Sequence, residues 1–169
     1  MLKRMAGLVA VSLLGAAPAF AGEKVFTASL SAEGDTAQTG SRAKGAARIV
    51  VDTDARTIDM TIDVTGLKNA DLWDRLVEAP VGPIHLHNYL ASGEVALVLP
   101  APFGSGYADT AKGFSVAVRD YDYAAGARLL KSSLSFEDFM TAMAAGSVVL
   151  NIHTDRFSNG EISGRVVTG

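Results

Sequence analysis

Short segments with alternating apolar and polar residues recur along most of the chain. In residues 58–65 every second side chain is apolar, and the set comprises Ile58, Met60, Ile62 and Val64. A period of two is typical of a β-strand that buries one face and exposes the other. Residues 24–30 and 46–52 show the same pattern, and the short connection between 46–52 and 58–65 predicts a hairpin.

Apolar residues recur at helical spacing in two places. Between Ser135, a suitable N-cap, and Gly146, a typical C-terminal stop, the apolar stripe comprises Phe136, Phe139, Met140 and Met143. This pattern predicts a helix over residues 135–145. A weaker pattern in residues 69–79 predicts a short helix or helical loop whose start Asp71 can cap.

The remaining segments complete the prediction of an all-β fold. Further strands are expected at residues 84–88, 94–99, 114–118, 148–154 and 161–167. Residues 100–113 are expected to form a long loop and residues 120–123 a turn. Short strands dominate, and only one clear helix precedes the final hairpin. We therefore expect an antiparallel β-sandwich or Greek-key barrel of about seven or eight strands.

The first residues have the composition of a secretory signal peptide. Lys3 and Arg4 precede an apolar run, and residues 19–21 (Ala-Phe-Ala) form a small-x-small cleavage pattern. The run is too short to span a bilayer comfortably, and no second transmembrane segment follows. We expect residues 1–21 to be cleaved as a signal peptide. Residues 22–169 would then form a single mature domain in the periplasm or outside the cell.

Charge and composition exclude several classes of protein. The chain has a formal net charge of -3 at pH 7, and removing Lys3 and Arg4 from its 15 basic residues would leave 13 against 18 acidic residues, a net charge of -5. An acidic chain without a Lys or Arg cluster after its N-terminus is not typical of a nucleic-acid-binding protein. The absence of cysteine excludes disulfides, thiolate metal sites and a cysteine nucleophile.

The candidate chemistry of the chain is concentrated in its three histidines. His85 and His87 are separated by one residue in the predicted strand at 84–88, so their side chains share one face. His153 lies in the predicted strand at 148–154 and would share a face with Asn151. Whether the three imidazoles meet depends on the register of these strands.

The histidines belong to a longer pattern of three segments. Residues 26–31 read Phe-Thr-Ala-Ser-Leu-Ser and residues 82–87 read Gly-Pro-Ile-His-Leu-His, while the third segment comprises Gly146, Asn151, His153, Thr154, Asn159, Gly160, Glu161, Ile162 and Gly164. In this order they resemble the opening strand, the central His-x-His strand and the closing signature of the CHRD domain. This family is named for its repeats in chordin and is also found in bacterial exported proteins. The chain departs from the family pattern at Asn88 and Ser163.

The resemblance implies an extracytoplasmic antiparallel β domain. Because the family has no well-established enzyme activity, it points to binding more than to catalysis. We therefore expect a binding or structural module in the cell envelope, with an unidentified protein or envelope ligand as partner. The aromatic residues of the long loops could form a recognition surface or, as we favour, cover the ends of the core; they comprise Tyr89, Phe103, Tyr107, Tyr121 and Tyr123.

The alternative function is a mononuclear metal site formed by His85, His87 and His153. Neutral imidazole is the commonest metal ligand, and without thiolates the candidate ions are copper and zinc. Copper-zinc superoxide dismutase is also a β-sandwich with a His-x-His strand, which suggests dismutase-like redox activity by analogy alone. This chain has too few histidines for the two-metal centre of that enzyme.

A structural role for the three histidines is the other interpretation. They would then hydrogen-bond in a polar seam between the sheets, where the expected partners are Asn151, Thr154, Glu161 and Arg165. A buried imidazole needs partners for both ring nitrogens, and these residues could provide them. Glu161 could also orient a metal-bound histidine. The sequence leaves both interpretations open.

Overall fold

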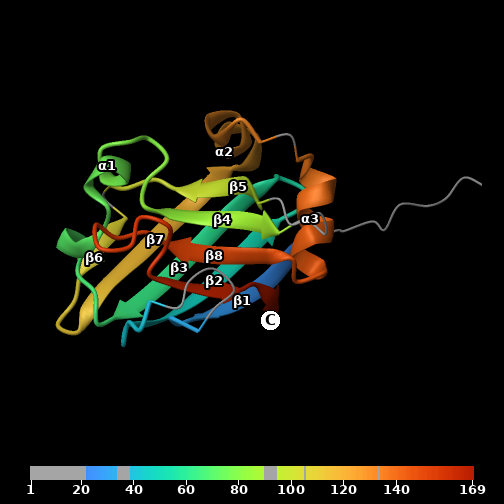
Figure 1. The fold of residues 1–169 in the computed structure, drawn as a ribbon. Helices are drawn as coiled ribbons and strands as arrows, with labels where there is room; N and C mark the ends of the chain where they lie inside the picture. The colour runs from blue at the N-terminus through green and yellow to red at the C-terminus, as the bar shows by residue number, and fades with distance from the viewer. Residues whose placement is uncertain (1–21, 34–38, 90–94, 105, 133) are drawn as a thin grey trace, which may run out of the picture.

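The protein is a sandwich of two antiparallel sheets (Figure 1). The computed structural model describes residues 22–33, 39–89, 95–104, 106–132 and 134–169. The larger sheet has the strand order β10-β1-β2-β3-β7-β6, and the smaller sheet has the order β5-β4-β8-β9. Of the two expected architectures, the sandwich is therefore correct. The expected signal peptide lies outside the described residues.

The larger sheet is built around an antiparallel meander. Its strands are β1 (Glu23–Leu30), β2 (Lys44–Asp52), β3 (Thr57–Thr65), β6 (Tyr107–Asp109), β7 (Gly113–Asp122) and β10 (Val167–Thr168). Ala47 of β2 lies opposite Ala28 of β1 on one side and Ile62 of β3 on the other, which confirms the predicted hairpin. On its other side β3 pairs with β7, where Phe114 lies opposite Val64.

The smaller sheet places the His-x-His strand in its interior. Its strands are β4 (Ile84–Tyr89), β5 (Val95–Ala101), β8 (Val148–Ile152) and β9 (Ile162–Arg165). β4 pairs with β5 on one side and with β8 on the other. Gly82 leads into β4 with a φ of +71°, and a Cβ at this position would lie 2.3 Å from the carbonyl oxygen of Ala101. Both the backbone conformation and the close approach therefore require glycine.

The hydrophobic core lies between the two sheets. Every second residue of the paired strands points into it and is fully buried, including Ile49, Ile58, Ile62, Ile84, Leu86, Leu150 and Ile152. Complete burial of such a side chain stabilises the fold by about 1.5–3 kcal/mol. The alternation visible in the sequence is thus the alternation between core and outer face.

One predicted helix and one predicted helical segment are confirmed. α3 (Phe136–Ala144) begins after its N-cap Ser135, whose hydroxyl accepts a hydrogen bond from the N–H of Asp138 at 3.0 Å. Residues 69–79 contain the short 3-10 turn η1 (Asn69–Asp71) and the single-turn helix α1 (Asp74–Val77). The expected cap is displaced, because Asp71 accepts from the N–H of Lys68 and does not begin α1.

A further helix before the final hairpin was not predicted from the sequence. α2 (Tyr123–Leu130) follows β7 directly, and Asp122 caps it by accepting from the N–H of Ala125. Gly126 weakens the helical signal of this segment. A Cβ there would lie 2.7 Å from the ring of Tyr121 and 2.8 Å from a methyl of Leu99, so glycine lets α2 pack against the sheet.

Two short strands were also missed. β6 lies within the expected loop at 100–113, and β10 is separated from β9 where a continuous strand was predicted. The described residues therefore contain ten strands, against the seven or eight expected. Both extra strands lie at sheet edges, where short pairings leave little pattern in the sequence.

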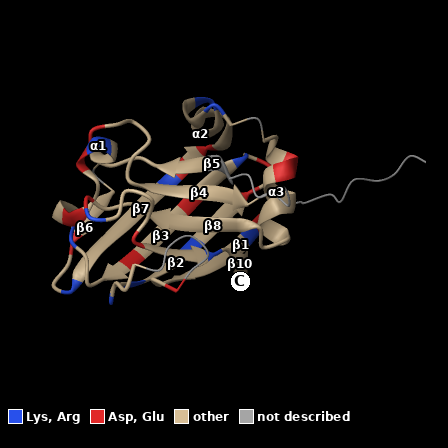
Figure 2. Cartoon of the chain, in the orientation of Figure 1, with Lys and Arg blue, Asp and Glu red and all other residues tan. Residues whose placement is uncertain are grey.

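Charged side chains are absent from the three strands around the His-x-His motif. Figure 2 shows β4, β5 and β8 without Lys, Arg, Asp or Glu, as their sequences require. The outer face of the larger sheet, by contrast, carries Arg48 and Asp63. None of the helices in the described ranges is long and apolar enough to cross a membrane.

Candidate functional site

His85 and His87 lie on the outer face of the smaller sheet. Their neighbours in β4, Ile84 and Leu86, belong to the core between the sheets, and successive side chains of a strand point to opposite faces. The two histidines are nevertheless buried, with exposures of only 4% and 9%. They therefore do not lie in a polar seam between the sheets.

The register of β4 and β8 brings His153 beside them. His85 lies opposite Asn151, and two residues further along the N–H of His153 donates to the carbonyl of Pro83 at 2.9 Å. His153 is thus the diagonal cross-strand neighbour of His85, a position from which long side chains touch. Its ring centroid lies 5.0 Å from that of His85 and 5.8 Å from that of His87.

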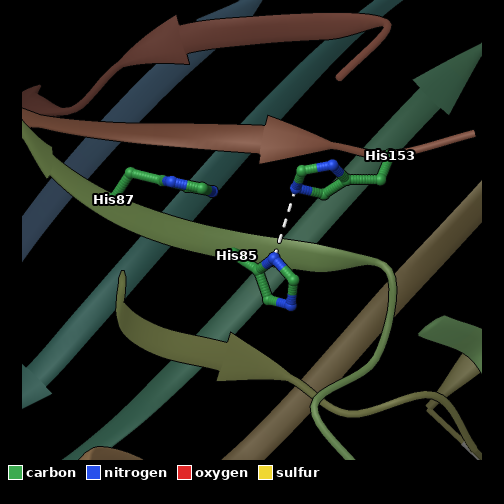
Figure 3. Close-up of side chains that lie close together, drawn as sticks. All are labelled: His85, His87 and His153. Atoms are coloured by element: carbon green, nitrogen blue, oxygen red, sulfur yellow. Dashed lines mark hydrogen bonds between the residues drawn. The ribbon is translucent and has the colours of Figure 1, made fainter. Parts of the chain in front are cut away.

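The three imidazoles form a compact triangle, here called the histidine cluster (Figure 3). Nδ1 of His85 lies 3.2 Å from Nε2 of His153. One nitrogen from each ring can be chosen so that all three lie within 4.8 Å of one another. Among the described residues, no other group of three or more His, Asp or Glu side chains brings potential ligand atoms this close. The fold thus brings together all three candidate ligands.

A backbone carbonyl fixes the tautomer of His153. Nδ1 of His153 lies 2.8 Å from the carbonyl oxygen of Ser158. Because a carbonyl can only accept, Nδ1 carries the proton, and Nε2 presents its lone pair to Nδ1 of His85. A hydrogen bond from the remote ring nitrogen to a carbonyl is the arrangement with which proteins usually orient a metal-binding histidine.

The turn that supplies this carbonyl is held in place by Asn151. The side-chain amide of Asn151 donates to the carbonyl of Asn159 at 3.0 Å. Gly160 packs directly on the same side chain: its φ is +117°, and a Cβ on it would lie 2.1 Å from Oδ1 of Asn151. The turn at residues 158–160 therefore needs glycine, and it positions His153 from outside the sheet.

All three imidazoles are neutral at pH 7. Burial is the main cause that lowers the pKa of His85 to about 3, and the His153 and His87 rings add to it against an opposing effect of the backbone at residues 81–82. Burial, followed by the His153 ring, lowers the pKa of His87 to about 4. Burial also lowers the pKa of His153. Neutral imidazole is the form that binds metal ions.

The spacing of the cluster suits one ion after a small rearrangement. Metal–imidazole bonds are about 2.0–2.1 Å long, which in tetrahedral geometry places two ligand nitrogens about 3.3 Å apart. The 3.2 Å between His85 and His153 meets this value. Across the whole cluster the nitrogens lie within 4.8 Å of one another, which is wider than the spacing around one ion. At least one ring would therefore have to move by about 1–1.5 Å to bind the same ion.

A model of the CHRD domain family matches residues 26–166, which include β4, β8 and the turn at 158–160. The chain belongs to the CHRD domain family. The searches of curated proteins and of solved structures each found no significant match. Family membership supports a binding or structural module and does not specify its partner.

The closing signature of the CHRD domain has a clear structural role here. Glu161 is buried, and its two carboxylate oxygens accept from the hydroxyls of Ser41 at 2.6 Å and Thr154 at 2.7 Å. These bonds tie the end of β8 to the segment before β2. The Asn151 side chain bonds to the Asn159 carbonyl, and Thr154 and Glu161 bond to each other. Within the described residues, none of these side-chain hydrogen bonds goes to an imidazole.

Two contacts of this CHRD domain site were not foreseen from the sequence. Ser158 contributes only its carbonyl, which no side-chain pattern can report. Trp73 lies beside His153, with ring centroids 6.4 Å apart, and its backbone N–H donates to the His153 carbonyl at 3.1 Å. An isolated bridge between Leu72 and Thr154 holds Trp73 there.

Most of the aromatic residues that were considered as a recognition surface of this CHRD domain pack against its hydrophobic core. Tyr107 and Tyr123 are buried, and their hydroxyls donate to the carbonyls of Ala101 and Leu134. Phe103 and Tyr121 pack against the core. The favoured interpretation, that these residues cover the core, is confirmed for these four.

Proposed function

We propose that this CHRD domain is exported to the cell envelope and binds one transition-metal ion, copper or zinc, through His85, His87 and His153. The observation that carries the proposal is the convergence of three buried, neutral imidazoles with nitrogens within 4.8 Å. A purely structural cluster should satisfy both nitrogens of every ring. In the described part of the chain, Nε2 of His85 and Nε2 of His87 have no hydrogen-bond partner.

The tautomers of His85 and His153 show which proton an ion would replace. Nε2 of His153 is unprotonated, so without an ion Nδ1 of His85 must donate to it, which leaves Nε2 of His85 as an acceptor without a donor. An ion in place of that proton would accept the lone pairs of both facing nitrogens, and His85 would then carry its proton on Nε2. Figure 3 shows His87 directed toward the space beside the other two rings.

Metal analysis tests the proposal directly. Protein isolated from its natural compartment is expected to contain close to one mole of copper or zinc per mole, and metal-free protein should bind one equivalent on titration. The double variant His85→Gln, His87→Gln should lose this binding, because two of three ligands are removed. Ser163→Ala, which alters a buried residue of the adjacent strand β9 without touching a ligand, should retain it. Wild-type protein with less than about a tenth of an equivalent and no binding on titration would refute the site.

The dismutase-like activity suggested by analogy is measured on the same preparations. Copper-loaded wild-type protein would have to accelerate superoxide decay, and the His85→Gln, His87→Gln variant would have to lose that acceleration. Acceleration that persists in the variant would assign the activity to adventitious copper and not to the cluster.

The location is tested by the mass of the mature chain. Expression of the full chain in a bacterial host should yield a protein in the envelope or medium that begins at Gly22, because residues 19–21 supply the cleavage pattern. Replacing Ala21 by Leu should slow cleavage, whereas Ala16→Leu, within the apolar run, should not. A full-length chain that stays in the cytoplasm would contradict export.

A further inference from the structure

We propose that the histidine cluster selects Cu(I) over divalent ions such as Zn(II). This inference rests on the proposed metal site and specifies its ion. It is drawn from three properties of the site: the charge of the ligand set, the charge of its surroundings and the number of ligands.

The ligand set contributes no negative charge. Its members are three imidazoles, and no carboxylate joins them among the described residues. A bound Zn(II) would therefore keep its full double charge, whereas Cu(I) would keep a single charge. Because the cost of placing an ion in a medium of low dielectric constant rises with the square of its charge, the divalent ion pays about fourfold more.

The surroundings do not supply the missing charge. The strands β4, β5 and β8 have no acidic residue (Figure 2). Glu161 is the buried carboxylate nearest in sequence to His153, and both its oxygens are already engaged by the hydroxyls of Ser41 and Thr154. Asp155 follows two residues after His153, but it is exposed and stands beside the exposed, positively charged Arg156. Exposed charges are screened by water and act weakly on a buried ion.

The number and burial of the ligands favour the same ion. Zn(II) sites in proteins are almost always four-coordinate, with water as the fourth ligand where only three protein ligands exist. Cu(I), a closed-shell monovalent ion, is stable with three ligands. The three histidines are only 4%, 9% and 7% exposed, so a permanently bound water would need room in a covered site. Imidazole binds both copper and zinc, so the softness of the ligands does not determine which ion is preferred. The preference is set by the charge and the coordination number of the ion.

Competition titrations of metal-free, full mature protein test the selection. Cu(I) affinity is measured without oxygen against bicinchoninate, and Zn(II) affinity against a chromophoric chelator, with Trp73 fluorescence as a direct monitor of the site. We expect Cu(I) to bind at least about a hundredfold more tightly than Zn(II). Ag(I), which is monovalent and not redox-active under these conditions, should displace Zn(II) as well.

A matched pair of variants isolates the effect of charge. His87→Glu and His87→Gln both remove one imidazole, but only the first adds a negative charge. His87→Glu should shift the preference toward Zn(II) by at least about tenfold relative to His87→Gln. Wild-type protein that binds Zn(II) as tightly as Cu(I) would overturn the selection and leave the metal site standing. Wild-type protein that binds neither ion would remove the metal site itself.

Discussion

Metal-free protein is expected to lose most of its stability as the pH falls from about 6.5 toward 4. The buried His85 and His87 have pKa values lowered from 6.5 to about 3 and about 4, mainly by burial. In the unfolded chain both regain the ordinary value, so between these limits the unfolded state binds more protons than the folded state. Stability therefore rises with pH in this range and is lost as the pH falls through it.

The expected loss is large compared with the stability of a domain. One unit of pKa difference corresponds to about 1.4 kcal/mol, so the two shifts together amount to several kcal/mol. The net stability of a folded domain is only about 5–15 kcal/mol. Above pH 6.5 the histidines are neutral in both states and the penalty disappears. Acid unfolding in the range of about pH 4–5 is the expected result.

Urea unfolding at several pH values after chelation measures this effect. Trp73, which lies beside His153, provides the fluorescence signal. In the matched variant His85→Gln, His87→Gln, the free energy of unfolding should fall much less between pH 7 and pH 4, because glutamine does not titrate. Equal losses in wild type and variant would show that other groups control acid stability.

The sequence predicted the strands that carry the cluster, but not the surface on which it lies. The alternation of Ile84 and Leu86 with two histidines correctly places His85 and His87 on one face of β4. Both faces of this strand are buried, however, and the sequence of β4 does not indicate which face meets the second sheet. On the outer face Trp73 and the turn at residues 158–160 contact His153, and their positions depend on long-range pairing.

The elements that were missed share one physical cause. α2 contains Gly126 and is preceded by Asp122, both typical of turns, yet the glycine is needed for packing and the aspartate caps the helix. β6 has three residues and pairs only with β7 at the sheet edge. In both cases tertiary packing outweighs a weak or contrary local preference, whereas the long alternating strands β1 to β3 need no such help.

The turn that holds His153 is expected to be the most sensitive point outside the ligands. Gly160→Ala would place a Cβ 2.1 Å from Oδ1 of Asn151 and force a non-glycine residue to a φ of +117°. A backbone outlier of this kind costs about 1–3 kcal/mol, and displacement of Asn151 adds the loss of its hydrogen bond to Asn159, about 1 kcal/mol. We expect the variant to be destabilised by about 3 kcal/mol.

The same substitution should weaken metal binding without removing a ligand. If the turn moves, His153 loses the Ser158 carbonyl that fixes its tautomer. Loss of such a partner typically lowers metal affinity by about 10- to 100-fold, and we expect a decrease of this order. Gly104→Ala is the matched control, because Gly104 is exposed, does not have positive φ and has no atom within 4 Å of an added Cβ. Its stability should stay within about 0.5 kcal/mol of wild type, with unchanged metal affinity. Thermal unfolding and the competition titration measure the stability and the metal affinity of both variants. Equal stability and equal affinity in Gly160→Ala and Gly104→Ala would show that the turn does not organise the cluster.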